Sequence, residues 1–155
     1  MSFPPRVGAE GANPYWMRGA AGVGNALVRY VRLTGEDKLG ALLDQLLGSR
    51  VGGISVSPGL FTGTAGLANL WLDCADLLGV PEYRAPARRA AESIVSLASI
   101  QPEGIAYGGE GFVRFSNDFA TGSAGIALLL DRVNRGGPDF NYTLDALLPE
   151  ALDAA

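Results

Sequence analysis

Apolar residues along this chain follow two helical patterns that alternate. Over residues 20–33 they occupy nearly every face of a helix, which predicts a helix buried on all sides. Over residues 36–47 the leucines recur at helical spacing along one face, which predicts an amphipathic helix with a polar back. The same pair recurs twice, with buried helices predicted over 64–78 and 123–133 and amphipathic helices over 82–99 and 144–152.

Each predicted buried helix begins at a Gly-x-Ala-Gly motif. The motif glycines are Gly19 and Gly22, Gly63 and Gly66, and Gly122 and Gly125. In the first two repeats the same number of residues separates the second motif glycine from the glycine that ends the helix, Gly35 or Gly79. Equal helix lengths indicate a structural repeat. Paired glycines also let each helix start pack closely against its neighbours.

These patterns predict an all-α fold, a partial α/α toroid in which the buried helices line the centre and the amphipathic helices wrap around them. We expect one domain over residues 1–155, with repeats over about 19–48, 63–99 and 122–153. Because three helix pairs form only an arc, the chain is expected to be part of a larger ring. A small β-hairpin is predicted within the glycine-rich linker 101–117.

Composition narrows the possible functions. The 12 basic and 16 acidic residues, with a pI near 4.7, provide no basic surface for nucleic acid. No apolar run approaches the roughly 18 residues that a membrane span requires. Residues 1–6 lack the pattern of a signal peptide, so we expect a cytoplasmic protein. The chain has no histidine and one cysteine, Cys74, which removes the commonest general base and most metal-ligand sets.

Three longer segments contain the glycine motifs and share further residues, namely 15–22, 59–66 and 118–125. Together they resemble the lanthionine synthetase C-like family, most closely the zinc-less C-terminal cyclase domain of class III lanthipeptide synthetases. The resemblance covers almost the whole chain but about half of the family domain, so it implies the C-terminal portion of that toroid. The implied function is thioether ring formation, in which cysteine thiols add to dehydroamino acids of a precursor peptide.

The resemblance also implies partners and the absence of a metal. The partners are the precursor peptide and the missing N-terminal part of the synthetase, which carries the kinase, the lyase and the remaining toroid repeats. Zinc-dependent relatives carry cysteine and histidine ligands at the positions that are Met17, Phe61 and Thr62 here. None of these three supplies a thiolate or an imidazole, so we expect neither zinc nor any other cofactor. Ring closure would then rest on holding the thiol and the alkene in position.

Four residues near the helix starts are candidates for the lining of a central cavity: Arg18, Thr62, Asp118 and Thr121. Arg18 could steer a peptide or polarise its carbonyl, or only extend its stem over the surface. The two threonines could donate hydrogen bonds into the cavity or satisfy the loop backbone. Asp118 could simply cap the third buried helix. We assign structural roles to Trp16 and Trp71, as large apolar groups of the core, and to Cys74, as a buried inert thiol.

Two alternatives to a cyclase domain remain at this point. The first is a non-catalytic arc that binds peptides or acts as a scaffold, or a truncated remnant, which self-associates through its uncovered apolar faces. Even as a cyclase domain, the isolated chain is expected to be inactive, because half of the cavity wall is missing. The second and weaker alternative is an α/α-toroid glycosidase that uses paired carboxylates such as Glu110 and Asp118.

Overall fold

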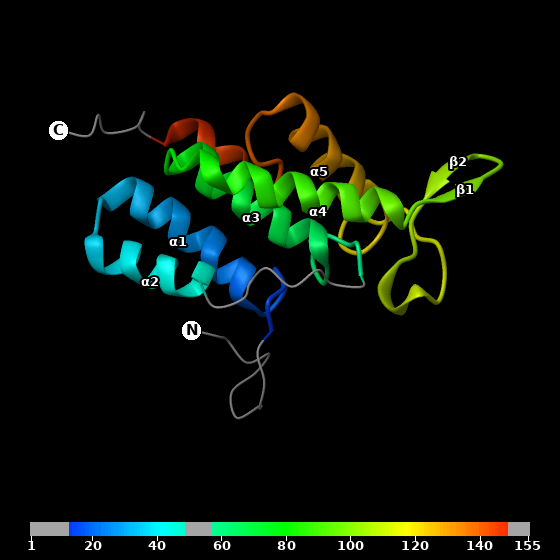
Figure 1. Ribbon diagram of the computed structural model, residues 1–155, viewed down its shortest axis with the longest axis horizontal. Helices are drawn as coiled ribbons and strands as arrows, with labels where there is room; N and C mark the ends of the chain where they lie inside the picture. The colour runs from blue at the N-terminus through cyan, green and yellow to red at the C-terminus, as the bar shows by residue number, and fades with distance from the viewer. Residues whose placement is uncertain (1–12, 49–56, 149–155) are drawn as a thin grey trace.

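The computed structural model describes residues 13–48 and 57–148, which are mostly helical with one two-stranded sheet. The α-helices are α1 (Ala20–Thr34), α2 (Asp37–Gly48), α3 (Thr64–Leu77), α4 (Arg84–Ser96) and α5 (Ser123–Arg135) (Figure 1). Shorter elements are the 3₁₀ helices η1 (Pro81–Tyr83), η2 (Glu110–Phe112) and η3 (Thr143–Leu147) and the strands β1 (Ser99–Gln101) and β2 (Gly104–Ala106). Within the described ranges no helix is long and apolar enough to cross a membrane.

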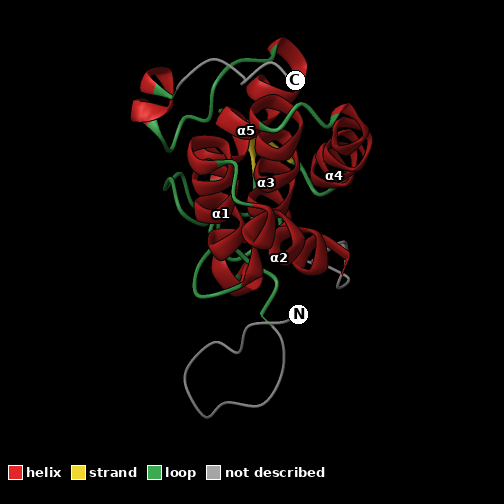
Figure 2. Ribbon diagram, turned by 90° about the vertical axis from the view of Figure 1, so that its left-hand side faces the viewer, coloured by secondary structure: helices red, strands yellow, loops and turns green. Residues whose placement is uncertain are grey.

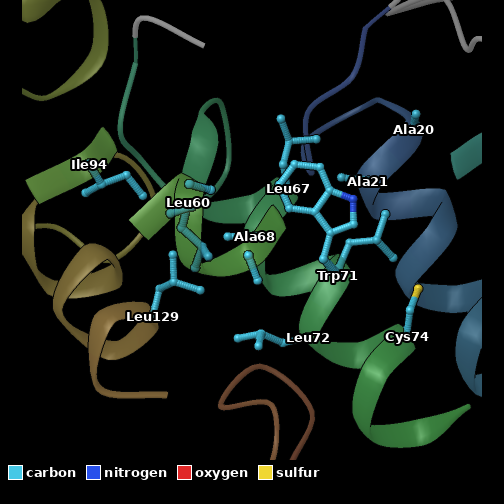
Figure 3. Close-up of a cluster of buried hydrophobic side chains, with 14 of the residues drawn as sticks. Ala20, Ala21, Leu60, Leu67, Ala68, Trp71, Leu72, Cys74, Ile94 and Leu129 are labelled. Carbon is cyan, nitrogen blue, oxygen red and sulfur yellow. The ribbon is translucent and has the colours of Figure 1, made fainter. Parts of the chain in front are cut away.

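Helix α3 is the centre of the structure. Every residue from Thr64 to Ala75 is buried, as the apolar pattern on all its faces predicts. It packs against α1, α4 and α5, and Figure 2 shows it between α1 and α4. Most of the labelled side chains in the core of Figure 3, including Leu67 and Trp71, come from α3 or from residues packed on it. The predicted burial of Trp71 and Cys74 is confirmed.

The prediction of burial on all sides is wrong for α1 and α5. On α1, Tyr30 is 50% exposed and Leu33 is 54% exposed, and on α5 Leu128 is 41% exposed. The reason is their place in the row of helices. Helix α3 has a neighbour on both sides, whereas α1 packs on α2 and α3 and α5 packs on α3 and α4. Within the part of the chain that the structure describes, one side of each terminal helix therefore stays uncovered.

The amphipathic helices α2 and α4 bury the faces that the sequence predicts. In α2, Leu43 and Leu46 are buried and the other three leucines of the stripe are half-buried. In α4, Ala87, Ala90, Ala91 and Ile94 are buried. The predicted helix over 82–99 is shorter at both ends, because it starts as η1 and ends at Ser96. Leu97 consequently lies outside the helix and is 39% exposed.

A β-hairpin follows α4 directly, earlier in the chain than predicted. Strands β1 and β2 pair antiparallel with Ile100 opposite Ile105, and Gly104 turns the chain at a φ of 135°. The pairing expected across the Gly-rich loop is present only as an isolated bridge between Gly108 and Phe115. Figure 1 shows the hairpin projecting beyond the end of the bundle at which α1, α3 and α5 begin.

The predicted outer helix over 144–152 is wrong in its described part. The chain forms the short 3₁₀ helix η3 there, and residues 149–152 lie outside the described ranges. Asp145 of η3 binds Arg29 of α1, so η3 lies beside the C-terminal half of α1. A 3₁₀ helix of fewer than two turns buries little apolar surface, and Leu144 and Leu147 are 72% and 79% exposed. In Figure 1, η3 lies at the end opposite the hairpin.

Candidate functional site

Three turns of the same geometry lead into α1, α3 and α5. We call them the glycine turns, residues 13–19, 57–63 and 116–122. In each one, the first helical N–H donates to the carbonyl that opens the turn: Ala20 to Asn13 (2.8 Å), Thr64 to Ser57 (2.9 Å) and Ser123 to Ser116 (2.8 Å). These bonds satisfy one of the backbone donors that every helix start leaves unpaired. The sequence motif therefore corresponds to one backbone structure used three times.

The second motif glycine of each turn is required for space. A Cβ atom at Gly22, Gly66 or Gly125 would lie 2.1, 2.2 or 2.1 Å from the carbonyl oxygen of Trp16, Leu60 or Phe119, respectively. The same atom at Gly66 would also lie 2.9 Å from Cβ of Trp16 in the preceding turn. The glycines thus allow close packing against the neighbouring turn, as predicted, but their closest contact is the carbonyl of their own turn.

Backbone hydrogen bonds join the three glycine turns side by side. The N–H of Met17 donates to the carbonyl of Phe61 at 2.8 Å, and the N–H of Phe61 donates to the carbonyl of Ala120 at 2.8 Å. These three residues occupy the same position in their respective turns. Met17 and Phe61, far apart in the sequence, are therefore brought into direct contact at one end of the bundle, and Thr62 follows Phe61 directly.

An aromatic row crosses this end of the bundle. It consists of Trp16, Phe61, Phe119 and Phe140, with ring centroids 4.5, 6.0 and 6.1 Å apart along the row. Spacings of this kind are those of favourable stacked and edge-to-face contacts. The side chains at positions 16 and 61 thus create an apolar surface. Trp16 is half-buried in this row, in keeping with the structural role assigned to it.

Two polar donors belong to the aromatic row or adjoin it in the chain. The Nε1 atom of Trp16 and the Oγ1 atom of Thr62 are buried and have no hydrogen-bond partner among the described residues. Buried donors of this kind usually find a partner, because an unpaired one costs about 1–3 kcal/mol. Of the four cavity candidates, Thr62 is therefore the one with a free donor at the junction of the turns.

The other three cavity candidates, Arg18, Asp118 and Thr121, are exposed or already hydrogen-bonded within their own turn. Arg18 is exposed and adopts a left-handed backbone conformation, with a φ of 58°. Asp118 is also exposed and accepts hydrogen bonds from Ser116, from the N–H of Thr121 (2.7 Å) and from the Thr121 hydroxyl (3.0 Å). Asp118 braces its turn and does not cap α5, whose first residue is preceded by Gly122. The hydroxyl of Thr121 is occupied by this bond.

The hydrogen bonds to Asp118 also bear on the glycosidase alternative. The hydroxyl of Ser116, followed by the N–H of Thr121, lowers the pKa of Asp118 to about 2. A glycosidase acid must hold a proton near neutral pH, which requires a raised pKa. Glu110, the other carboxylate considered, lies in the exposed turn η2. The electrostatic setting of Asp118 is therefore the opposite of what the acid role needs.

A second group of polar residues, not found by our sequence analysis, lies near the other end of the helices. Arg29 of α1, Asp73 of α3 and Arg132 of α5 form buried ion pairs. Arg29 Nη1 lies 2.8 Å from Asp73 Oδ2, and Arg132 Nη2 lies 2.9 Å from Asp73 Oδ1. Asn25 donates to Asp73 at 2.7 Å, and Arg132 donates to the amide oxygen of Asn69 at 2.6 Å. Helices α1, α3 and α5 are thus joined by charge as well as by apolar packing.

The segment after α5 completes this arginine–carboxylate network. Asp139 accepts a hydrogen bond from Asn69 at 2.7 Å and lies 3.2 Å from Arg29. Asp145 accepts two hydrogen bonds from Arg29, at 2.9 and 2.6 Å, and the ring of Tyr142 lies 3.5 Å from the Arg29 guanidinium carbon. Bidentate carboxylate pairing and aromatic contact are the interactions for which a guanidinium is suited.

Burial is the main influence on the central carboxylate of the network. Burial and, after it, the charge of Asp139 raise the pKa of Asp73 to about 7, although Arg132 and Arg29 oppose the rise. Burial likewise raises the pKa of the Cys74 thiol to about 12, which fits the inert role predicted for it. Asp73 can therefore exchange a proton near neutral pH, whereas Cys74 stays a thiol.

The sequence does carry a signal for this network. Arg29, Asp73 and Arg132 stand at the same position relative to the second motif glycine of their repeats, and Asn25 and Asn69 are likewise equivalent. A charged residue at one register of three apolar helices must be paired if the helices are buried. The alternation of basic, acidic and basic residues along the row then predicts which ones pair.

Comparisons with known proteins assign no function to the aromatic row or to the arginine–carboxylate network. No protein-family model matches the chain, and no curated protein matches it. Within the residues that the structure describes, no group of three or more His, Cys, Asp or Glu side chains is arranged to hold a metal ion. The function is therefore argued from the geometry of the two ends of the bundle and from the sequence motifs.

Proposed function

We propose that the chain is a three-repeat arc of an α/α toroid of the lanthionine synthetase C-like type, and that its aromatic end binds a precursor peptide for thioether ring formation. The observation that carries this proposal is the contact between Met17 and Phe61. In the resembling family these two positions must lie together, because zinc-dependent members use them for one metal. The three side-by-side turns also agree with an arc in which inner helices all begin at one end.

The proposed reaction needs little from the protein beyond position. A cysteine thiolate forms a bond to the β carbon of a dehydroamino acid, the π electron pair moves to the α carbon, and a proton from water completes the thioether. The aromatic row would hold the apolar parts of the peptide. Positioning two reactants in this way can contribute several kcal/mol, on the order of 7 or more at best.

We infer that this chemistry proceeds without zinc. Met17 and Phe61 offer neither thiolate nor imidazole, and the sulfur of Cys74 is buried inside α3. The cysteine of the peptide must then ionise by itself, so any ring closure should accelerate up to pH values near the thiol pKa of about 8.5. Elemental analysis of untagged protein should give much less than one zinc per chain. Stoichiometric zinc that survives dialysis would contradict the zinc-less assignment.

The second candidate function is a peptide-binding scaffold without catalysis. This candidate is favoured by the small number of reactive groups near the aromatic row. The carboxylate of Asp118 accepts hydrogen bonds from its own turn, so that among the charged candidates the exposed Arg18 remains to contact a peptide. Under both proposals the partners are a precursor peptide and the rest of a cytoplasmic synthetase, with its kinase, lyase and further repeats. They differ only in whether the bound peptide reacts faster than it does in water.

One experiment separates the two candidates. A synthetic peptide with one cysteine and one dehydroalanine is titrated onto the chain by calorimetry, and ring closure is followed as the loss of alkylatable thiol. We expect saturable binding with little or no acceleration by the isolated chain. Phe61→Leu should weaken binding up to about ten-fold, the equivalent of about 1.4 kcal/mol. The control Phe115→Leu, an exposed residue near the hairpin, should not.

The outcomes bear on the proposal as follows. Binding that Phe61→Leu weakens, without acceleration, supports the scaffold. Clear acceleration would show that the arc is a cyclase by itself. Absence of saturable binding, or binding equal in the two leucine variants, would refute the assignment of a peptide site to the aromatic row.

A further inference from the structure

The segment over residues 137–148, here called the C-terminal segment, is attached to the bundle unevenly. Its first part is anchored by Asp139, which is 3% exposed, and by Phe140 in the aromatic row. Its second part, residues 142–148, is held mainly by Arg29, through Asp145 and the ring of Tyr142. Leu144 and Leu147 of this part are exposed. Its attachment therefore depends on charge and on one guanidinium.

A pocket lies between this part of the segment and α1. Its volume is about 350 Å³, and its lining includes Arg29, Leu33, Asn141, Tyr142 and Asp145. A segment that belonged to the packed core would leave few voids larger than a water molecule beneath it. Arg29 thus borders a space in which a ligand could take the place of Asp145 and Tyr142.

The balance of charge indicates what Arg29 attracts. Without the carboxylates of the C-terminal segment, Arg29 and Arg132 face Asp73 as their shared buried counter-charge, with Asp76 at the outer side of Arg132. Asp139 and Asp145 add two negative charges to this group. The charge of Asp139 raises the pKa of Asp73 in addition to burial, which is the response expected of a carboxylate crowded by others. Arg29 and Arg132 thus face three carboxylates, those of Asp73, Asp139 and Asp145, which is one more than the balance of charge requires.

We propose that Arg29 is a binding site for the carboxylate of an acidic peptide, and that Asp145 of the chain occupies this site when residues 142–148 lie against α1. The preferred ligand carries an aromatic residue close before the carboxylate, as Tyr142 stands before Asp145. Its carboxylate takes both hydrogen bonds of Arg29, and its ring takes the guanidinium face. This site lies beside the C-terminal half of α1, next along the chain to Phe140 of the aromatic row, and it does not depend on ring-forming chemistry.

The test uses the full chain and a variant that vacates the site. The probe is a blocked synthetic peptide that copies residues 138–148, and binding is measured by calorimetry at low ionic strength. Asp145→Asn preserves the volume of the side chain but removes the charge that competes with the probe. We expect it to bind the probe about ten-fold more tightly than the unmodified chain does, because a site closed most of the time loses affinity in that proportion.

Three controls make the result specific. Asp131→Asn removes an exposed carboxylate that pairs with Arg135 at 2.9 Å, and it should bind the probe as the unmodified chain does. A probe with asparagine in place of its second aspartate should bind Asp145→Asn weakly. Inorganic phosphate at matched ionic strength should compete no better than chloride. Thermal melting of Asp145→Asn verifies that the variant is folded.

The same measurements can overturn the proposal. Equal affinity of Asp145→Asn and the unmodified chain for the probe would show that Asp145 does not compete with the probe for Arg29. Retained affinity for the asparagine probe would show that no carboxylate is recognised, and strong competition by phosphate would indicate a general anion site. None of these results would affect peptide binding at Phe61, which is measured with a different peptide and a different variant.

Discussion

The two ends of the helical row are built from different interactions. At the end where α1, α3 and α5 begin, three turns are joined by backbone hydrogen bonds and covered by aromatic rings. Near the other end, Arg29, Asp73 and Arg132 join the same three helices through buried charges. The backbone bonds that join the turns at the first end do not titrate, and the carboxylate of Asp118 in one of these turns has a lowered pKa. The second end contains a carboxylate that titrates near neutrality, so its stability must respond to protons.

The two ends should also respond to different kinds of substitution, the glycine turns to added volume and the arginine–carboxylate network to the loss of a charged partner. At the glycine turns a single added methyl group has no room, because a carbonyl oxygen occupies its place. At the arginine–carboxylate network the removal of one partner is harmful because it leaves a buried ion without its counter-charge.

The largest effect is expected for Gly66→Ala. Its Cβ atom would lie 2.2 Å from the carbonyl oxygen of Leu60 and 2.9 Å from Cβ of Trp16, both in fixed surroundings. We expect a loss of about 3 kcal/mol or more in the free energy of unfolding, measured by chemical denaturation. Gly40→Ala in α2 is the control, because nothing lies within 4 Å of its Cβ position. It should stabilise the protein by up to about 1 kcal/mol, and equal effects would contradict the steric account.

Asp73→Ala should have the next largest effect. It leaves Arg29 and Arg132 buried without their shared counter-charge, which is expected to cost about 3 kcal/mol. Asp73→Asn should cost less, because it preserves the volume and because the native carboxyl already titrates near neutral pH. The control Asp131→Ala removes an exposed ion pair and should change stability by about 0.5 kcal/mol or less. A small effect of Asp73→Ala would show that the network contributes little.

The pH dependence should differ in sign between the two ends. The pKa of Asp73 is raised to about 7 in the folded chain from 3.8, so the folded state retains a proton that the unfolded state has lost. Its contribution to the free energy of unfolding therefore decreases as the pH rises from about 4 to about 7. Asp118, with a pKa lowered to about 2, contributes stability above about pH 4 that is lost as the pH falls towards 2.

Two variants isolate these contributions in a denaturation series over pH. Asp73→Asn should remove the decrease between about pH 4 and 7 and leave the acid limb unchanged. Ser116→Ala, which removes the hydroxyl that lowers the Asp118 pKa, should reduce only the acid limb. If Asp73→Asn kept the full slope near neutral pH, the titrating group would have to be another one.

The smallest effect concerns the uncovered sides of α1 and α5. Tyr30 and Leu128 are 50% and 41% exposed on these sides, and exposed apolar surface favours association. We expect the isolated chain to dimerise at high concentration, as seen by light scattering. Tyr30→Glu should shift the equilibrium towards the monomer, whereas Ala41→Glu on the exposed face of α2 should not. A monomer over the whole concentration range would contradict this expectation.

The structure also shows which features local sequence patterns can predict. The bounds of α1, α2, α3 and α5 agree with the predicted ranges within two residues, because apolar periodicity and the glycines at the helix ends are local signals. The ends of α4 and the position of the hairpin were predicted less well. Leu97 and Ile100 continue an apolar pattern, yet the chain leaves the helix there and exposes both residues.

Long-range polar pairing was the part that local patterns missed. Nothing near Asp145 in the sequence indicates that its partner is Arg29, more than a hundred residues earlier. In the described part of the expected C-terminal outer helix, the chain instead forms η3 and places Tyr142 and Asp145 against Arg29. The contact between Met17 and Phe61 is also long-range, and the repeated motif is the sequence feature that indicates it.

The central claim is that the aromatic end, and not the charged end, binds the peptide that undergoes ring closure. Amide-resolved NMR of the labelled chain, titrated with the peptide that carries one cysteine and one dehydroalanine, tests it most directly. We predict the largest saturable shifts at Met17, Phe61, Thr62 and Ala120, whose amides lie where the three turns meet. Shifts confined to residues around Arg29 and Asp145, or no saturable shifts at all, would contradict the account.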